Sequence, residues 1–261
     1  SPVLIENLEK LRRLGVIVLG PRIEEGLAKI VEIDEIILTV EHILSPKRLE
    51  GKRILITSGP TLEPIDPIRI LTNRSSGRTG LELAKTAYRQ GAEVTLVHSK
   101  ELNVTGIKEV KVETAREMVD ACLNELRKGY DALISAAAIS DFTVDPSDVK
   151  LSSVGELHLL LRPTKKLIAE VRKEFPELVI VGFKAETNVS KNELLRRARE
   201  KMVTYNLQMV VANDVGKGGI GRPENEVYIL RKGTQEIKHV NGPKTIIAEE
   251  IMNELIALFS S

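Results

Sequence analysis

The sequence predicts an α/β protein with a Rossmann-like, mostly parallel sheet that is flanked by helices and ends in a β-hairpin. Short aliphatic and β-branched runs alternate with segments of helical periodicity from about residue 50 onward, which is the pattern of strands joined by crossover helices. The strand runs are almost continuously apolar, as expected of strands covered on both faces. Two late runs flank a short loop containing Gly233, which is typical of a hairpin.

The expected elements alternate along the chain. In order they are strand Arg53–Ser58, helix Thr79–Gln90, strand Glu93–His98, helix Ala115–Arg127, strand Ala132–Ala136, helix Lys166–Phe175, strand Val179–Phe183, helix Lys191–Tyr205, strand Met209–Asn213, hairpin strands Glu226–Leu230 and Glu236–Val240, and helix Lys244–Phe259. Thr114 suits the N-cap of the second helix, and Gly91 suits the end of the first.

The first 49 residues do not follow this alternation. They predict a strand between two helices, at Leu4–Leu14, Val16–Leu19 and Ile33–Ile43. One strand and two helices cannot bury a core of their own. We therefore expect residues 1–49 to be an appendage or the end of a neighbouring domain, with a linker at residues 46–51. The main domain is expected to span residues 50–261.

Composition and charge exclude several classes of function. Of the 261 residues, 42% are hydrophobic and 29% are charged, which is the balance of a globular protein. The formal charge is only +1 and Trp is absent, so neither a basic nucleic-acid surface nor a base-stacking platform is expected. No apolar run approaches the ~20 residues of a membrane span, and we expect no signal peptide. The single cysteine, Cys122, favours a buried structural thiol in a reducing, cytoplasmic compartment.

A candidate anion site follows the first strand. The strand runs into Gly59, and a helix begins after Ser75-Ser76-Gly77. A helix start offers unpaired backbone N–H groups and the positive end of the dipole, and Arg74 and Arg78 are placed to contact phosphate. An isolated Ser-Ser-Gly is more often only a helix cap. This one follows the first strand of an open parallel sheet, where ligands bind, so we favour function.

Polar residues also follow the later strands. The third strand ends in Ser135-Ala136-Ala137-Ala138-Ile139-Ser140-Asp141, where small residues let a ligand approach the backbone and Asp141 can accept hydrogen bonds. A tight turn with an Asx cap is the alternative. Residues 182–187 and 212–215 end the next two strands, and four polar strand ends on one edge predict a single ligand site. The irregular residues 138–155 are expected to be a long loop that acts as a lid.

Other common sites are not readable in this sequence. The first loop lacks G-x-G-x-x-G, and the second strand ends in His98-Ser99-Lys100, without an acid to hold a ribose. No G-K-[ST] follows the first strand. His42, His98, His158 and His239 are dispersed, without the spacing of a metal or catalytic cluster.

These segments, in this order, resemble phosphopantothenoylcysteine synthetase, the phosphopantothenate–cysteine ligase half of a bifunctional enzyme of coenzyme A biosynthesis. The resemblance covers residues 51–259, and its anchors are ITSGPTLEPIDPIRILTNRSSGRTG, SAAAISDF, GFKAET and VVANDV. The opening ENLEKLRRLGVIVLGP resembles the last stretch of the flavin-dependent decarboxylase that precedes the ligase in the fused protein. Because the decarboxylase's flavin-binding and catalytic segments are not in this sequence, we expect no bound flavin and no decarboxylase activity.

The resemblance implies a two-step ligation in the cytoplasm. The carboxylate of 4′-phosphopantothenate attacks the α-phosphate of CTP, giving an acyl-cytidylate and pyrophosphate. The amine of L-cysteine then displaces CMP. Mg²⁺, whose ligands stay unassigned, and lysines would screen the triphosphate. The resemblance further implies a homodimer, for which the hairpin at residues 226–240 is a candidate interface, and a decarboxylase domain as partner in the fused protein.

Carried over position by position, the resemblance implies catalytic roles for three residues. Asn73 would stabilise the carbonyl of the acyl-cytidylate, Arg69 would stand beside it, and Lys150 on the flap would be needed for nucleotide activation. Beside Gly59, Ser75, Ser76 and Gly77 of the anion site, the nucleotide-binding positions are Ser135, Ala136, Ala137, Asp141, Arg162, Pro163, Thr164, Lys165, Phe183, Lys201 and Tyr205.

Three positions depart from the family's pattern. Ser152 stands where many relatives have a second flap lysine, Lys165-Lys166 replaces Pro-Asp, and Tyr205 replaces a helix lysine. These exchanges redistribute basic groups, so the choice between CTP and ATP stays open. Two other functions remain as alternatives: a non-catalytic nucleotide sensor, and an NAD(P)-dependent oxidoreductase, which would need a dinucleotide loop, a ribose-binding acid and usually a Tyr-x-x-x-Lys pair.

Overall fold

The structure, a computed structural model, describes residues 2–20, 22–24, 27–100, 102–217 and 224–260. The chain forms two compact units, Ser1–Ser45 and Pro46–Ser261. None of the helices in the described ranges combines the length and the apolar character that a bilayer span requires.

The first unit contains two helices and a small hairpin. Its elements are α1 (Pro2–Arg13), β1 (Arg22–Glu24), β2 (Leu27–Lys29) and α2 (Ile33–Leu44). The strand predicted at Val16–Leu19 is wrong. Those residues have no regular structure, and the antiparallel pair β1–β2 lies further along the chain. An apolar run becomes a strand only when a partner pairs with it, and this run has none among the described residues.

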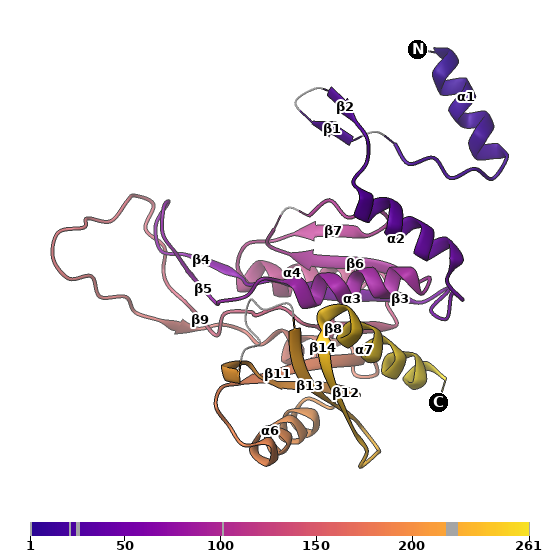
Figure 1. Ribbon diagram of the computed structural model, residues 1–261. Helices are drawn as coiled ribbons and strands as arrows, with labels where there is room; N and C mark the ends of the chain where they lie inside the picture. The colour runs from indigo at the N-terminus through magenta and orange to yellow at the C-terminus, as the bar shows by residue number, and fades with distance from the viewer. Residues whose placement is uncertain (1, 21, 25–26, 101, 218–223, 261) are drawn as a thin grey trace. The chain divides into compact units, whose positions relative to one another are not determined.

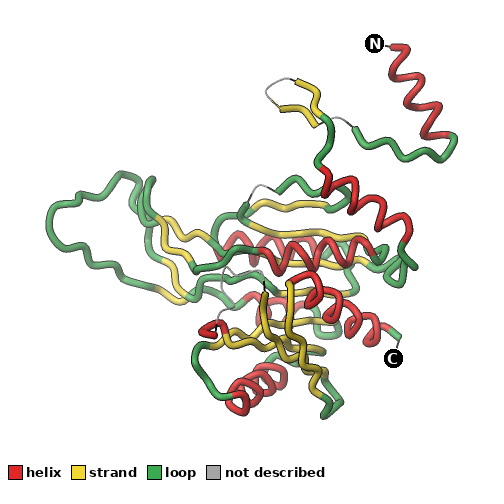
Figure 2. Tube along the Cα trace, viewed as in Figure 1, coloured by secondary structure: helices red, strands yellow, loops and turns green. Residues whose placement is uncertain are grey.

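An eight-stranded sheet forms the second unit, in the order β14-β13-β12-β11-β8-β3-β6-β7. Its strands along the chain are β3 (Arg53–Ser58), β6 (Glu93–His98), β7 (Lys108–Lys111), β8 (Ala132–Ser135), β11 (Val179–Glu186), β12 (Met209–Asp214), β13 (Glu224–Arg231) and β14 (Ile237–Pro243). Neighbours from β7 to β12 are parallel, and the two pairings of β13 are antiparallel. The predicted α/β fold with a C-terminal hairpin is confirmed (Figure 2).

Helices cover both faces of this sheet (Figure 1). One face is covered by α3 (Arg78–Arg89) and α7 (Lys244–Phe259), and the other by α4 (Ala115–Leu126), α5 (Leu167–Glu174) and α6 (Lys191–Thr204). Ile54 belongs to the first apolar layer and Leu55 to the second. Because successive residues of a strand face opposite sides, a strand between two helical layers must be apolar throughout. Cys122 is fully buried in the second layer, where burial raises the pKa of its thiol.

The predicted helix ends at Thr114 and Gly91 are both present. The Thr114 hydroxyl accepts a hydrogen bond from the Glu117 N–H at 3.2 Å, and the Glu117 carboxylate accepts one from the Thr114 N–H, so the two residues form a capping box. Gly91 follows α3 with a φ of +93°, a left-handed conformation that glycine adopts without strain.

The strand order places a topological switch point between β3 and β8. From β3 the chain passes to β6 and β7 on one side, and then returns to β8 on the other. The parallel strands thus have the order of a Rossmann fold, in which ligands bind at the carboxyl ends beside this switch point. The sequence did not predict β7 because its four residues, Lys108–Lys111, begin and end in lysine and lie on the edge of the sheet, where no apolar run is required.

Two loops extend from one side of the sheet and form an arm, which we define as residues 62–72 and 142–163 (Figure 1). It contains two short antiparallel pairs, β4 (Leu62–Pro64) with β5 (Ile70–Thr72), and β9 (Phe142–Thr143) with β10 (Arg162–Pro163). The predicted loop at residues 138–155 is therefore interrupted by β9, and its irregular part continues to β10.

Part of the predicted linker is packed. Leu49 is fully buried and its N–H donates to the Gln90 carbonyl at 2.8 Å. By packing, this residue belongs to the second unit.

Candidate functional site

A cavity of about 370 Å³ lies at the carboxyl ends of the central strands. The loop before α3, the turn after β8, the strands β11, β12 and β13, and the start of α7 contribute its walls. The lining residues are Asn73, Arg74, Ser75, Ser76, Gly77, Arg78, Thr79, Gly80, Ala136, Ala137, Ala138, Phe183, Ala185, Asn213, Val215, Asn225, Val227 and Lys244.

The floor of the cavity depends on the close approach of α3 to the end of β3. A Cβ atom added to Gly80 would lie 2.6 Å from both Cβ and Oγ of Ser58. Gly77 has a φ of +74°, and its carbonyl accepts a hydrogen bond from the Ser58 hydroxyl at 2.8 Å. Glycines at these two positions therefore let the helix begin directly against the central strand.

The start of α3 is open to an anion. Gly77 provides no side-chain cap. The Arg78 N–H donates to the Ser76 hydroxyl at a long 3.4 Å, and the remaining N–H groups of the first turn can donate to a ligand. Among the described lining residues, Arg74, Arg78 and Lys244 are cations and none carries a carboxylate. The predicted anion site at Ser75, Ser76 and Gly77 thus lies in a positively charged cavity, where the helix dipole adds to the side-chain charges.

The turn after β8 forms the opposite wall and is held by the last residues of β3 and by Gly59, which follows that strand. The Ala137 N–H donates to the Thr57 hydroxyl at 3.1 Å, and the Ala138 N–H donates to the Gly59 carbonyl at 2.9 Å. These bonds bring the predicted residues Gly59, Ala136 and Ala137 together, as the switch-point argument requires. Ser135, the last residue of β8, is buried beneath them.

Asn73 joins the two walls. Its Nδ2 atom donates to the carbonyls of Ala138 and Ile139 at 3.1 and 3.2 Å. Both amide hydrogens are therefore used by the backbone, and Oδ1 is the atom left to meet a ligand as an acceptor. The predicted role of Asn73 is to stabilise the carbonyl of an intermediate. To donate to that carbonyl, the amide would have to give up its hydrogen bond to Ala138 or to Ile139.

Phe183 and Lys201 lie together beside the cavity. The Lys201 ammonium donates to the Phe183 carbonyl at 2.6 Å, and Phe183 lines the cavity. Burial, with repulsion from Lys184 and Lys166, lowers the pKa of Lys201 to about 8, against the attraction of Asp141. This lysine is thus a cation near neutral pH that titrates in a range where enzymes work.

The arm holds Arg69 and Lys150 away from the lining of the cavity. Asp66, whose side chain is fully buried, accepts hydrogen bonds from the N–H groups of Ile68 and Arg69 at 2.8 Å and of Leu151 at 3.2 Å. Arg69 pairs with Asp66 at 2.8 Å and donates to the Leu151 carbonyl. Burial opposes ionisation, but these donors together hold the pKa of Asp66 below its usual value. Arg69 therefore orders the flap next to Lys150, which is itself exposed.

The remaining predicted positions divide between the base of the arm and the second apolar layer. Asp141 pairs with Lys166, and its carbonyl accepts a hydrogen bond from the Thr164 N–H at 3.0 Å. Arg162 pairs with Asp145 at 3.0 Å, while Pro163 lies in β10 and Lys165 is exposed.

Tyr205 lies elsewhere. It follows α6, packs against the second apolar layer, and accepts a hydrogen bond from Arg172 at its carbonyl. The structure does not bring Tyr205 to the cavity.

Asn213, one of the predicted strand-end residues 212–215, lies near the end of the buried strand β12 and lines the cavity. Sequence reasoning missed two other polar residues of the cavity, Asn225 and Lys244. Asn225 and Lys244 carry no local signal, because β13 and β14 fold back antiparallel and bring them to the site from far along the chain. Lys100 was also missed. Its ammonium donates to the Ser76 carbonyl at 2.7 Å and so supports the anion loop.

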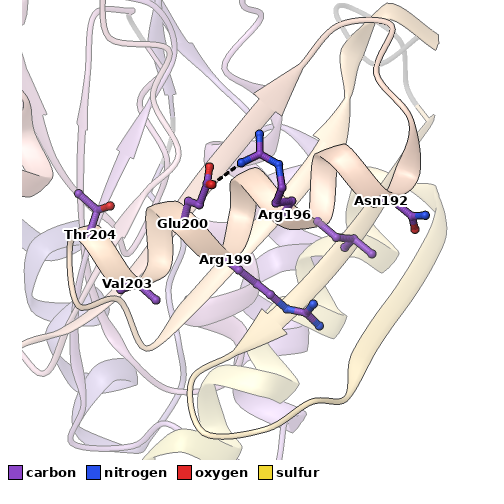
Figure 3. A pocket seen from close by; sticks show the side chains of 7 residues that line it. Asn192, Arg196, Arg199, Glu200, Val203 and Thr204 are labelled. Atoms are coloured by element: carbon purple, nitrogen blue, oxygen red, sulfur yellow. Dashed lines mark hydrogen bonds and ion pairs between the residues drawn. The ribbon is translucent and has the colours of Figure 1, made fainter.

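A second hollow lies along α6 and, unlike the cavity, does not bring together polar residues from several elements (Figure 3). Its lining comes from one helix and consists of Asn192, Leu195, Arg196, Arg199, Glu200, Val203 and Thr204. Arg196 and Glu200 pair with each other, and no predicted site residue is among them.

Neither a metal site nor the Tyr–Lys pair of an oxidoreductase is found at the cavity among the described residues. Among the described residues, no three His, Cys, Asp or Glu side chains are grouped as metal ligands. Tyr228 and Lys232 have the Tyr-x-x-x-Lys spacing, but Tyr228 lies in β13, where four residues span about 13 Å rather than one helical turn. Lys232 donates to Asn206, outside the cavity lining.

Comparison with known proteins gives consistent matches. The profile of the DNA/pantothenate metabolism flavoprotein C-terminal domain matches residues 49–258. The coenzyme A biosynthesis bifunctional protein CoaBC of Thermococcus kodakarensis is 43% identical over 257 residues, which are 97% of this chain and 63% of that protein. CoaBC of Methanocaldococcus jannaschii is 40% identical over 258 residues, 98% of this chain and 63% of that protein. The chain thus spans 63% of the length of each of these two relatives.

A solved structure agrees with the observed fold. The crystal structure of the C-terminal domain of a CoaBC protein superposes with a TM-score of 0.68 at 32% identity, covering 82% of this chain and 98% of that chain.

Proposed function

We propose a function from one premise: the chain belongs to the family of the DNA/pantothenate metabolism flavoprotein C-terminal domain, and the resemblance to phosphopantothenoylcysteine synthetase is confirmed. The proposed function is ligation of 4′-phosphopantothenate to L-cysteine in coenzyme A biosynthesis. The observation that carries it is the cavity at the switch point, where the start of α3 meets Arg74, Arg78 and Lys244 and where no described lining residue is a carboxylate. Such a site suits a substrate with several phosphates.

The proposed chemistry activates a carboxylate with a nucleotide. The carboxylate oxygen of 4′-phosphopantothenate forms a bond to the α-phosphorus of CTP, and the bond from that phosphorus to the bridging oxygen breaks, so pyrophosphate leaves with the electron pair. The cysteine amine then attacks the acyl carbon and gives up a proton, and the bond from that carbon to the phosphate oxygen breaks, so CMP leaves with the electron pair. In this scheme the protein aligns the reactants and neutralises charge, which are the two contributions its cavity is built to make.

Each side chain has a place in this proposal. The α3 start with Ser75, Ser76 and Gly77 would bind the triphosphate, and the turn at Ala136 and Ala137 would contact the nucleotide. Lys201 would contact the nucleotide from the side of Phe183, to which it is bonded. Arg69 would order the flap that carries Lys150.

Mg²⁺ is part of the proposal, but the described residues do not form a site for it. The lining residues that the structure describes include no carboxylate, and a hard cation prefers oxygen ligands. The ion would therefore be held by the phosphates of the nucleotide, where it would supply further charge screening.

A homodimer is also proposed, and the arm supports it. The arm exposes Ile68, Ile70, Phe142, Val149 and Leu160, with exposed fractions from 45% to 69%. Clustered exposed apolar side chains are typical of an interface. The edge strand β14 of the predicted interface hairpin offers a second surface. Sedimentation of the purified chain should give twice the monomer mass, and Ile68→Asp should shift it towards the monomer.

The decisive experiment measures pyrophosphate release. Purified protein with Mg²⁺, 4′-phosphopantothenate and one of CTP, ATP, UTP or GTP should release pyrophosphate only when the acid is present. Adding cysteine should then give the amide and the nucleoside monophosphate. No pyrophosphate with any of the four nucleotides would exclude the ligase. Binding without turnover would favour the sensor, and an absorbance change with a nicotinamide cofactor would favour the oxidoreductase.

A further inference from the structure

Lys244 is a mostly buried cation that no residue in the described part of the chain neutralises. It is the first residue of α7 and is only 7% exposed. Its ammonium makes no hydrogen bond or ion pair with any residue in the described ranges, yet the residue lines the cavity. The ammonium is not fully enclosed, but a charge with little access to water and no partner is unfavourable, and binding an anion would relieve that cost.

The neighbours of Lys244 add to this cost. Arg78, the first residue of α3, lines the same cavity and carries the same charge. Burial and then repulsion by Arg78 lower the pKa of Lys244. The starts of two long helices, α3 and α7, therefore converge on one cavity, and each brings a cation. Both dipoles and both charges favour the same ligand, a polyanion.

We propose that Lys244 and the start of α7 bind the terminal phosphates of the nucleoside triphosphate and hold the pyrophosphate as it leaves. This inference rests on the proposed ligase function and extends it to a residue of the C-terminal helix. In the first step the carboxylate oxygen bonds to the α-phosphorus, and the bridging oxygen departs with the β- and γ-phosphates. Charge grows on that leaving group, and Lys244 together with Arg78 is placed to stabilise it.

The position of Lys244 favours contact with the terminal phosphates over contact with the rest of the nucleotide. Asn73 is bonded to the turn after β8, and Phe183 and Lys201 lie at β11. Lys244 follows directly on β14, whose last residue pairs with β13, so it enters the cavity from the side of the antiparallel hairpin. Nucleotide and acyl contacts are thus on the β8–β11 side, and the unpaired cation is on the other.

The test compares ligands that differ only in terminal phosphates. Calorimetry on the full chain would use inorganic pyrophosphate, CTP, CMP and 4′-phosphopantothenate, with wild type, Lys244→Met and Lys244→Arg. Lys85→Met is the matched control, because it removes the same charge from α3 at a residue outside the cavity lining. Circular dichroism and the thermal midpoint are measured first, and Lys244→Gln replaces the methionine variant if that variant does not fold.

We expect Lys244→Met to weaken pyrophosphate and CTP binding on the order of 10-fold to 100-fold, the effect of one charge-assisted hydrogen bond. CMP and 4′-phosphopantothenate should change by less than about twofold, so the ratio of CTP to CMP affinity falls. Lys244→Arg should restore most of the loss, and Lys85→Met should match wild type.

An unchanged CTP-to-CMP ratio in Lys244→Met would overturn the inference, and so would a loss confined to 4′-phosphopantothenate. If the wild type nonetheless forms the amide, the ligase function stands and only the role of Lys244 fails. If the wild type binds no nucleotide and releases no pyrophosphate, both fail together.

Discussion

The contact between Gly80 and Ser58 predicts a large effect of one methyl group. A Cβ on Gly80 would lie 2.6 Å from Cβ and Oγ of Ser58 and 3.0 Å from its Cα, whereas ordinary van der Waals contact begins at 3.4 Å. The helix or the strand must therefore move by about 0.8 Å. Ser58 ends the central strand and is 2% exposed, so neither side has room.

The expected loss of stability in Gly80→Ala combines two destabilising terms and one stabilising term. Overpacking a buried contact costs about 1–3 kcal/mol. Displacing α3 also breaks the bond from the Ser58 hydroxyl to the Gly77 carbonyl, worth about 1 kcal/mol. Alanine is favoured over glycine within a helix by about 1 kcal/mol at most, which offsets the lost bond. We expect Gly80→Ala to lower the free energy of unfolding by about 1–3 kcal/mol.

Urea unfolding measures this loss, and the KM for the nucleoside triphosphate measures its consequence at the site. Because the start of α3 is displaced, KM should rise on the order of 10-fold. Gly20→Ala is the control, since nothing lies within 4 Å of its Cβ, and it should cost less than about 0.5 kcal/mol. Adding Ser58→Gly to Gly80→Ala should recover part of the stability. A Gly80→Ala protein as stable as wild type would refute the reasoning.

Further predictions concern three side chains of the proposed nucleotide site. Asn73→Asp should slow amide formation more than pyrophosphate release and lower the thermal midpoint, because a carboxylate cannot donate to the Ala138 and Ile139 carbonyls; unchanged cysteine incorporation would contradict this role. Lys150→Gln should block pyrophosphate release without unfolding the chain, since Lys150 is exposed, and normal release would count against it. The pKa of Lys201 is lowered to about 8, so its charge is lost as pH rises through that value and the nucleotide KM should rise above it; Lys201→Arg should remove this inflection. Between pH about 8 and 10.5 the unfolded chain binds the extra proton, so stability should rise with pH in the same window.

Much of the fold is determined by local patterns in the sequence. The apolar runs at β3 and β6 give both strands with their observed ends, because a strand covered on both faces needs an unbroken apolar run. Thr114 caps the start of α4 through its side-chain hydrogen bond, and Gly91 follows the end of α3 with a positive φ. Each signal depends on a single residue. The elements that failed were those without such a signal: β7 at the polar edge, the short pairs of the arm, and the strand expected at Val16–Leu19, which found no partner.

The candidate site divides in the same way. The sequence alone pointed to the loop at Ser75–Gly77 and to the turn after β8, which line the same cavity, because a parallel sheet brings the carboxyl ends of its strands to one edge. Only the tertiary structure decided that Lys244 lines the cavity. Lys244 follows the antiparallel strands β13 and β14, and it reaches the cavity because these strands fold back on β12. The tertiary structure alone also decided that the Asn73 amide donates to two backbone carbonyls and that the pKa of Lys201 is lowered. Hydrogen-bond partners and burial depend on residues distant in sequence, and no local pattern carries them.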